Sequence, residues 1–131
     1  MKKKVSIILF LIMCLSSVSA FAAVGNYAGK VRVFGDLEST LVTKTTSLNF
    51  AYNQVDYIQR GTLVSWVELN SNGANVSEDV AYTTTGSKFM NFYNNVHNLN
   101  PSMRLNISTS AGTFETVDTF GTWSPNWFFQ I

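Results

Sequence analysis

Apolar and polar residues alternate along much of this chain, and a period of two residues is typical of strands. In Lys30–Phe34, Val31 and Val33 alternate with charged residues. From Leu41 to Tyr52 most even positions are apolar and the odd positions are polar. Leu63–Leu69 is dense enough in apolar residues to be a central strand. We therefore expect strands over these three segments.

Two hairpins are predicted from turn residues that separate alternating segments. After the strand at Leu63–Leu69, Asn70–Gly73 contains an Asn-Gly pair, which supplies the positive φ angles of a tight turn, and 74–84 alternates again. Later in the chain, a turn at Ser110–Gly112 separates 103–108 from 114–123. We expect each pair of segments to fold back on itself as a hairpin.

The segment 89–96 fits two descriptions. Phe89, Phe92, Tyr93 and Val96 have helical spacing, and Ser87 could cap a helix. The segment is also rich in Asn, a poor helix former, and in aromatic residues, which favour strands. We expect a strand that runs into a loop, with a short helix as the alternative.

Antiparallel strands with one apolar face need a second layer to cover that face. About six such strands and their turns predict an all-β fold, a small antiparallel β-sandwich. A flattened β-barrel would also bury these faces, and it stays open as the alternative.

The N-terminus has the pattern of a secretory signal peptide. Lys2, Lys3 and Lys4 precede an apolar run, Val5–Leu15, which small residues follow up to Ala23. We expect cleavage after Ala22, which leaves residues 23–131 as a single secreted, extracellular domain. An uncleaved membrane anchor is the alternative, although the run is shorter than the about 20 residues that span a bilayer.

Removal of residues 1–22 changes the chemistry of the chain. The only cysteine, Cys14, is lost, so stability must come from a core without disulfides. Six Lys and Arg residues remain against eight Asp and Glu, for a net charge of −2. This balance does not support nucleic acid as a partner, nor an anionic surface held by charge.

Catalytic and metal-binding patterns are missing from the sequence. His97 is the only histidine, no Gly-x-Ser-x-Gly motif accompanies it, and the glycines are scattered as turn residues rather than grouped around a phosphate. With no second His or Cys, zinc has no ligand set, and the acidic residues are too sparse for a calcium loop. We expect a protein that is not an enzyme and binds no metal or cofactor. A small hydrolase that uses two carboxylates or His97 is the remaining enzymatic hypothesis.

Aromatic residues near the C-terminus are the candidate contacts. The apolar ending 127–131 is either a last strand or an exposed anchor, and a large exposed apolar patch usually marks a contact. We expect a binding protein, bacteriocin-like or directed to the cell surface, whose partner is a bacterial membrane or cell-surface component. Self-association through edge strands is also open. The predicted binding residues are Trp123, Trp127, Phe128 and Phe129.

A carbohydrate-binding module is the alternative function. Exposed aromatic rings can stack on sugars while Asn side chains bind hydroxyl groups. The rings proposed for such a platform are Trp66, Trp123, Trp127 and tyrosines such as Tyr52 or Tyr57.

The segment Gly121–Asn126, which reads GTWSPN, follows a region rich in Asn, Thr and Ser. Together with the Lys-led signal peptide, it resembles the ending of small exported Gram-positive bacterial proteins of uncharacterised function. That resemblance implies an extracellular β domain, with some relatives encoded near antimicrobial or export genes. It implies no catalytic residue, and it puts Trp123 and Pro125 forward as a structural corner.

Overall fold

The structure is a computed structural model that describes residues 24–93 and 101–126. Within these residues every regular element is a strand, and no helix is long and apolar enough to cross a membrane. The strands are β1 (Gly25–Val31), β2 (Leu37–Glu38), β3 (Val42–Thr43), β4 (Phe50–Ile58), β5 (Leu63–Leu69), β6 (Val80–Tyr82), β7 (Gly86–Asn91), β8 (Ser102–Thr109) and β9 (Val117–Ser124).

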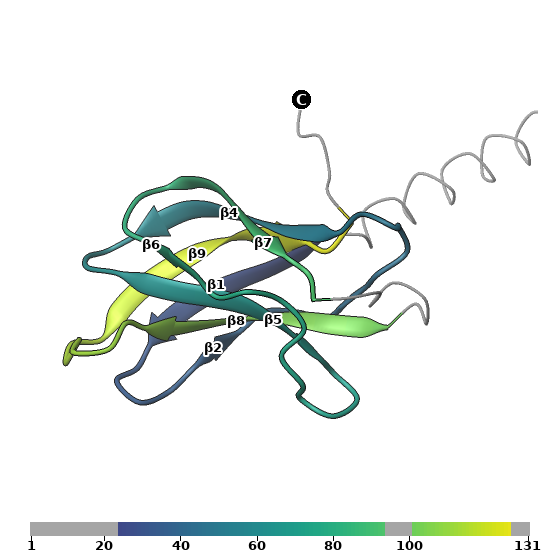
Figure 1. Cartoon of the computed structure of the whole chain (residues 1–131). Coiled ribbons are helices and arrows are strands. Elements are labelled where there is room, and N and C mark those ends of the chain that lie inside the picture. Colours follow the sequence, from purple (N-terminus) through teal and green to yellow (C-terminus); the bar gives the residue numbers. More distant parts are fainter. Residues whose placement is uncertain (1–23, 94–100, 127–131) are drawn as a thin grey trace, which may run out of the picture.

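The strands form two antiparallel sheets that pack as two layers (Figure 1). Sheet A has the order β1-β9-β4-β7. Sheet B has the order β2-β8-β5-β6, and β3 also pairs with β8, so that β2 and β3 share one edge. The sheets are not closed into a barrel. The protein is therefore a small β-sandwich, and the flattened barrel is not its fold.

Alternate residues of both sheets meet in the core between the layers. In β5 and β8 the inward aliphatic side chains except Leu69 are completely buried, and burying one such side chain contributes about 1.5–3 kcal/mol. Sheet A adds the largest buried side chain, Trp123. The most deeply buried members of the core are Val31, Ala51, Val55, Leu63, Val67, Met90, Met103, Leu105, Ile107, Val117 and Trp123.

A short polar chain crosses this core and joins the sheets. Tyr27 Oη donates to Asn53 Oδ1 at 2.7 Å, and Asn53 Nδ2 lies 3.5 Å from Ser65 Oγ. Burial raises the pKa of the Tyr27 phenol, so the hydroxyl keeps its proton and remains the donor. Because Asn53 belongs to sheet A and Ser65 to sheet B, these bonds fix how the two layers lie on each other.

The first predicted hairpin is confirmed as a strand pairing, but its second strand is only β6 (Val80–Tyr82) and not the whole of 74–84. Strand β5 pairs with β6, with Leu63 opposite Tyr82, and a bridge joins Glu68 to Asn75 next to the turn. Gly73 has φ of 70°, as the Asn-Gly turn requires.

The second predicted hairpin is wrong, although its two strands exist. Strand β8 pairs with β5, β2 and β3 in sheet B, whereas β9 lies between β1 and β4 in sheet A. The connection 110–116 therefore crosses from one sheet to the other. The turn residues marked the end of a strand, but they do not determine which strand pairs with it.

Two other predicted strands have different limits. The strand expected at 30–34 begins earlier and ends at Val31, and its last residues form a loop. The strand expected at 41–52 is two strands, because the chain crosses from β3 in sheet B to β4 in sheet A at 44–49. The strand expected at 89–96 is present as β7 up to Asn91, and residues 94–96 lie outside the described part.

Candidate binding site at one end of the sandwich

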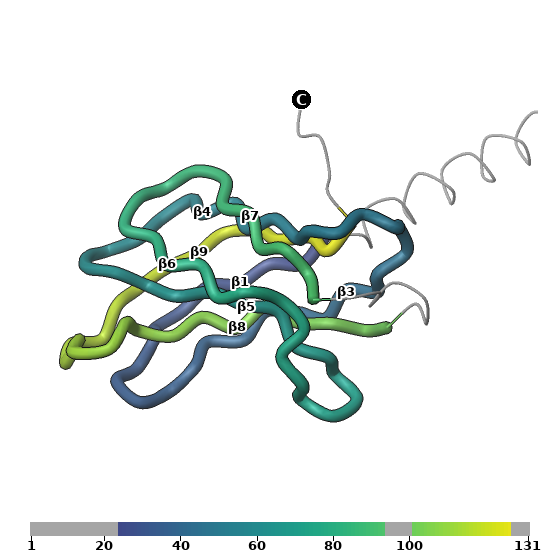
Figure 2. Tube along the Cα trace, in the orientation of Figure 1, coloured from purple at the N-terminus to yellow at the C-terminus, as the bar shows by residue number. Residues whose placement is uncertain are grey.

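Four connections lie at one end of the sandwich (Figure 2). They are the loops β1–β2 (32–36), β4–β5 (59–62), β6–β7 (83–85) and β8–β9 (110–116). The strand registers require this, because the ends of β1 and β4 lie beside the start of β9, and the end of β8 lies beside the start of β5. We call this end the loop end. Gly25 and Ser124 lie at the opposite end.

Phe34, in the loop β1–β2, is the most exposed large apolar residue of the described part, with 95% of its surface accessible. Its φ is 62°, the left-handed region, which a bulky side chain rarely adopts. A turn in which Gly35 N donates to Arg32 O at 3.0 Å holds it there. The side chain is neither buried nor suited to its backbone conformation, and such strained residues cluster at functional sites.

Phe114 stands in the neighbouring loop β8–β9 and is 77% exposed. The preceding turn is closed by a bond from Thr113 N to Ser110 O at 3.1 Å and by contact between the two hydroxyl groups at 3.0 Å. A pocket of about 340 Å³ lies between the two loops. Its walls are mainly apolar, and the residues that line it are Val33, Phe34, Gly35, Asp36, Ser108, Thr109, Ser110, Ala111, Gly112, Thr113 and Phe114.

Four charged residues at the loop end form two pairs of opposite sign, whereas Arg32 and Asp36 form no ion pair within the described residues. Arg60 contacts Glu115 at 3.0 Å, and Lys30 lies 3.7 Å from Asp118. These pairs are exposed to solvent, where ion pairs contribute little energy. The loop end therefore has no strong local field of one sign, and its principal binding capacity is apolar.

Asp36 is the carboxyl group in the pocket wall. Burial raises the pKa of this carboxyl, and the carboxylates of Glu68 and Glu38 raise it further. Protonation of Asp36 at acidic pH would make the pocket more apolar.

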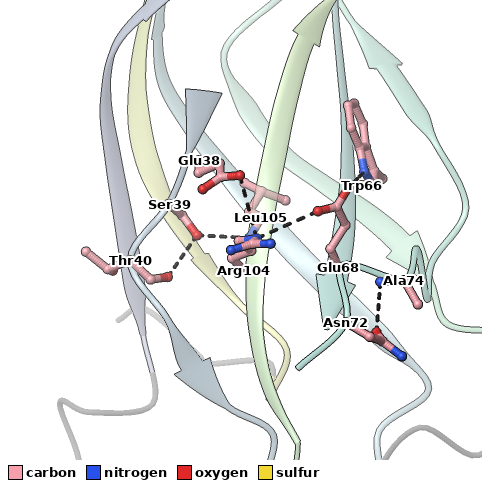
Figure 3. A network of polar contacts seen from close by, with 9 residues as sticks. All are labelled: Glu38, Ser39, Thr40, Trp66, Glu68, Asn72, Ala74, Arg104 and Leu105. Atoms are coloured by element: carbon pink, nitrogen blue, oxygen red, sulfur yellow. Dashed lines mark hydrogen bonds and ion pairs between the residues drawn. The ribbon is translucent and has the colours of Figure 1, made fainter. Parts of the chain in front are cut away.

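The outer face of sheet B carries a network of charged residues (Figure 3). Arg104 Nε lies 3.7 Å from carboxylate oxygens of both Glu38 and Glu68, and Trp66 Nε1 donates to Glu68 Oε1 at 2.9 Å. The network thus connects β2, β8 and β5. In the described ranges no group of three His, Cys, Asp or Glu residues is arranged to hold a metal ion. We assign the network a structural role.

The binding role expected for Trp123 is corrected by the structure. The ring is completely buried between the sheets, and its Nε1 donates to Thr40 O at 3.4 Å. Strand β9 is central, and position 123 faces inward, so the ring offers no surface to a partner. The other predicted contacts, Trp127, Phe128 and Phe129, lie outside the described residues, as does His97.

The aromatic platform proposed for carbohydrate does not assemble from the expected residues. Trp66 lies on the outer face of sheet B, Tyr57 on the outer face of sheet A, and Tyr52 is 4% exposed. Sequence reasoning missed Phe34 and Phe114. Both are bulky aromatic residues in turn sequences, where the alternating pattern ends. An aromatic residue at such a position was the feature of the sequence that could have indicated an exposed contact.

Comparison with known proteins finds no matching family model, curated protein or solved structure. What the loop end can do therefore follows from its own residues. It presents two exposed phenyl rings and an apolar pocket on loops that a rigid sandwich holds in place. This arrangement suits contact with an apolar surface.

Proposed function

We propose that the chain is a secreted, non-enzymatic protein that acts by binding, and that the loop end contacts the lipid surface of bacterial cells. The observation that carries the proposal is the exposure of Phe34 in a strained conformation beside Phe114. Secretion is supported by the signal-peptide pattern of residues 1–22. The action that fits such a contact is bacteriocin-like perturbation of the membrane.

The energetics favour a peripheral, reversible contact. Burying one Phe side chain contributes about 2–3 kcal/mol, so two rings give a weak but measurable attachment. Arg60 and Lys30 are already paired with carboxylates, but the exposed Arg32, two residues before Phe34, forms no ion pair in the described part of the chain. We therefore expect binding to strengthen modestly on anionic lipid and to weaken with added salt.

The predicted C-terminal anchor and the loop end make separable contributions. Ser124, at the end of β9, pairs with Tyr52 at the end of the sandwich opposite to Phe34. Asn126, the last described residue, therefore lies far from the loop end. A flat bilayer can contact only one of the two ends at a time. Variants at each end therefore show which end makes the contact.

Co-sedimentation with liposomes of bacterial lipid composition tests the proposal. Residues 23–131 would be compared with the double variant Phe34→Asn/Phe114→Ser, with a chain that lacks 127–131, and with Phe120→Ser. Phe120 is an exposed Phe of sheet A that lies away from the pocket, so it is the matched control.

We expect the double variant to stay in the supernatant and the Phe120→Ser control to pellet with the liposomes. Pelleting of the double variant at the level of the unmodified protein would refute the loop end as the contact. Loss of pelleting only on removal of 127–131 would assign the contact to the C-terminal residues instead. Dye-leakage and killing assays then test the bacteriocin-like action.

A further inference from the structure

The outer face of sheet A carries a row of neutral polar side chains that runs across all four strands. Asn26 of β1 lies opposite Thr122 of β9, Thr122 lies opposite Gln54 of β4, and Gln54 lies opposite Ser87 of β7. Because alternate residues of a strand share one face, these four side chains point away from the core. Each is an amide or a hydroxyl group.

Aromatic rings flank this polar row on both sides. On one side Tyr57 and Phe120 stack with centroids 5.3 Å apart and planes 16° apart. On the other side Phe50 and Phe89 meet edge to face at 5.6 Å. Tyr57, Phe89 and Phe120 are 40–49% exposed, which leaves much of each ring open to solvent.

We propose that this face binds an uncharged polysaccharide chain. The rings would lie against the apolar faces of sugar rings, while the amides and hydroxyls between them would bind sugar hydroxyl groups. The proposal concerns another face than the loop end and stands independently of the lipid contact. It also uses different residues from the platform expected from the sequence, of which only Tyr57 lies here.

The polar row has hydrogen-bonding capacity that the described part of the protein leaves unused. Ser87 Oγ donates to Gln54 Oε1 at 2.7 Å, which leaves the Gln54 amide nitrogen as a donor for a ligand. Thr122 Oγ1 has no hydrogen-bond partner within the described ranges, but it is shielded from solvent and so offers no bond to a ligand in this conformation. The hydrogen-bonding capacity open to a ligand therefore comes from the amide of Gln54 and from the exposed Asn26.

The charge of this face selects the class of ligand. None of the four residues of the polar row or the two ring pairs beside it is charged. The nearest charge is the carboxylate of Asp56, exposed at the bulge directly before Tyr57, and the next row, Lys30 opposite Asp118, is an ion pair of 3.7 Å. Nucleic acids and anionic polymers are bound through unpaired cations, which this face does not offer. A neutral polyhydroxy chain is the ligand whose chemistry matches both the amides and the rings.

The size of the face selects a chain over a single sugar. Successive outward positions on one strand are roughly 7 Å apart, and neighbouring strands lie about 4.8 Å apart. Phe120 and Phe89 are two outward positions apart and Tyr57 and Phe50 are three, so the ring pairs lie roughly 14 to 21 Å from each other along the strands. A chain of several sugar units can contact both ring pairs at once.

Affinity gel electrophoresis of the purified chain tests the proposal. The gels would contain hydroxyethylcellulose, glycogen or galactomannan as uncharged polymers and heparin as the charged polymer. Variants would be Phe120→Ala and Gln54→Ala, with Trp66→Ala on the outer face of sheet B as the aromatic control and Phe114→Ala as the variant that reports on the loop end. Urea unfolding would confirm that all are folded. We expect retardation by an uncharged polymer and roughly tenfold weaker binding by Phe120→Ala, the loss expected for one aromatic contact.

Retardation that weakens in Phe120→Ala and Gln54→Ala but not in Trp66→Ala would support the proposal. Migration unaffected by all three uncharged polymers would overturn it, as would equal or stronger retardation by heparin. Equal weakening by Phe114→Ala would assign the binding to the loop end. If light scattering shows a dimer that Phe120→Ala dissociates, the face is an interface between two copies and the polysaccharide proposal fails.

Discussion

Phe34 and Phe114 line the same pocket although each belongs to a different crossover between the sheets. Phe34 lies between β1 of sheet A and β2 of sheet B, and Phe114 lies between β8 of sheet B and β9 of sheet A. Their relative position is therefore set by the packing of the whole sandwich. A rigid scaffold that presents apolar loop residues in this way is suited to binding.

Replacing Phe34 by Asn should stabilise the fold. Asn adopts the left-handed conformation more readily than Phe, and the exposed ring contributes no packing that would be lost. We expect the free energy of unfolding in urea to rise by about 0.5–1 kcal/mol. A lower free energy of unfolding would show that the ring supports the fold, and it would remove the argument that the strain at Phe34 serves binding.

Gly121→Ala should be strongly destabilising. A methyl group at this position would collide with the Gln54 carbonyl oxygen and would lie 2.6 Å from Tyr27 Oη. We expect a loss of about 3 kcal/mol in urea unfolding, because the core cannot move to accept it. Gly35→Ala is the control, since its nearest contact would be Arg32 Cβ at 3.5 Å. Equal stability of the two variants would contradict the packing described around Gly121.

Asn126 is expected to hold the crossover between β3 and β4. Its Oδ1 accepts hydrogen bonds from Thr45 N at 2.7 Å and Thr46 N at 3.1 Å, and its Nδ2 donates to Thr43 O at 2.9 Å. Asn126→Ala leaves these backbone groups unpaired, so we expect a loss of about 3 kcal/mol.

The matched control for Asn126 is Asn72→Ala at the exposed β5–β6 turn. Asn72 Oδ1 accepts one hydrogen bond, from Ala74 N at 2.9 Å, in contact with solvent. We expect a loss of less than about 1 kcal/mol there. A loss of similar size for both variants in chemical unfolding would mean that Asn126 does not secure the crossover.

The stability of the protein should increase between pH 8 and pH 10 because of Lys44. This side chain is completely buried, and its Nζ donates to Pro125 O at 2.8 Å. Burial lowers the pKa of Lys44 from 10.5 to about 8. Over this interval the unfolded chain binds more protons than the folded chain, so the free energy of unfolding rises with pH.

Lys44→Met should remove that rise. Measurements of urea unfolding should stay below pH 10, because burial raises the pKa of Tyr82 from 10.0 to about 12 and stability linked to this phenol is lost above pH 10. A rise with pH that persists unchanged in Lys44→Met would show that Lys44 is not the titrating group.

Local patterns in the sequence determine the strands better than they determine strand pairing. Alternation located β5 and β8 and the Asn-Gly turn located the β5–β6 hairpin, because side-chain period and turn angle are properties of neighbouring residues. The pairing of β8 and β9 was wrong because both are central strands with the same alternation. Contacts with strands that are distant in the sequence determine to which sheet each of the two belongs.

The candidate site was harder to predict for the same reason. Nothing near Phe34 in the sequence indicates Phe114, and the loops meet only because both sheets are assembled. Trp123 was expected to be a contact because a large aromatic near an apolar ending is ambiguous between core and surface. Its inward position on β9 resolves the ambiguity, and the polar row of sheet A likewise depends on registers between four strands.

The most direct test of the lipid contact is a fluorescence measurement at position 34. Residues 23–131 contain no cysteine, so Phe34→Cys can carry a single environment-sensitive dye, and Phe120→Cys provides the matched label on sheet A. On addition of liposomes of bacterial lipid composition, we predict a blue shift and increased intensity for the dye at 34 and an unchanged spectrum for the dye at 120. An unchanged spectrum at 34 under conditions where the protein pellets with the liposomes would contradict the assignment of the loop end as the contact surface.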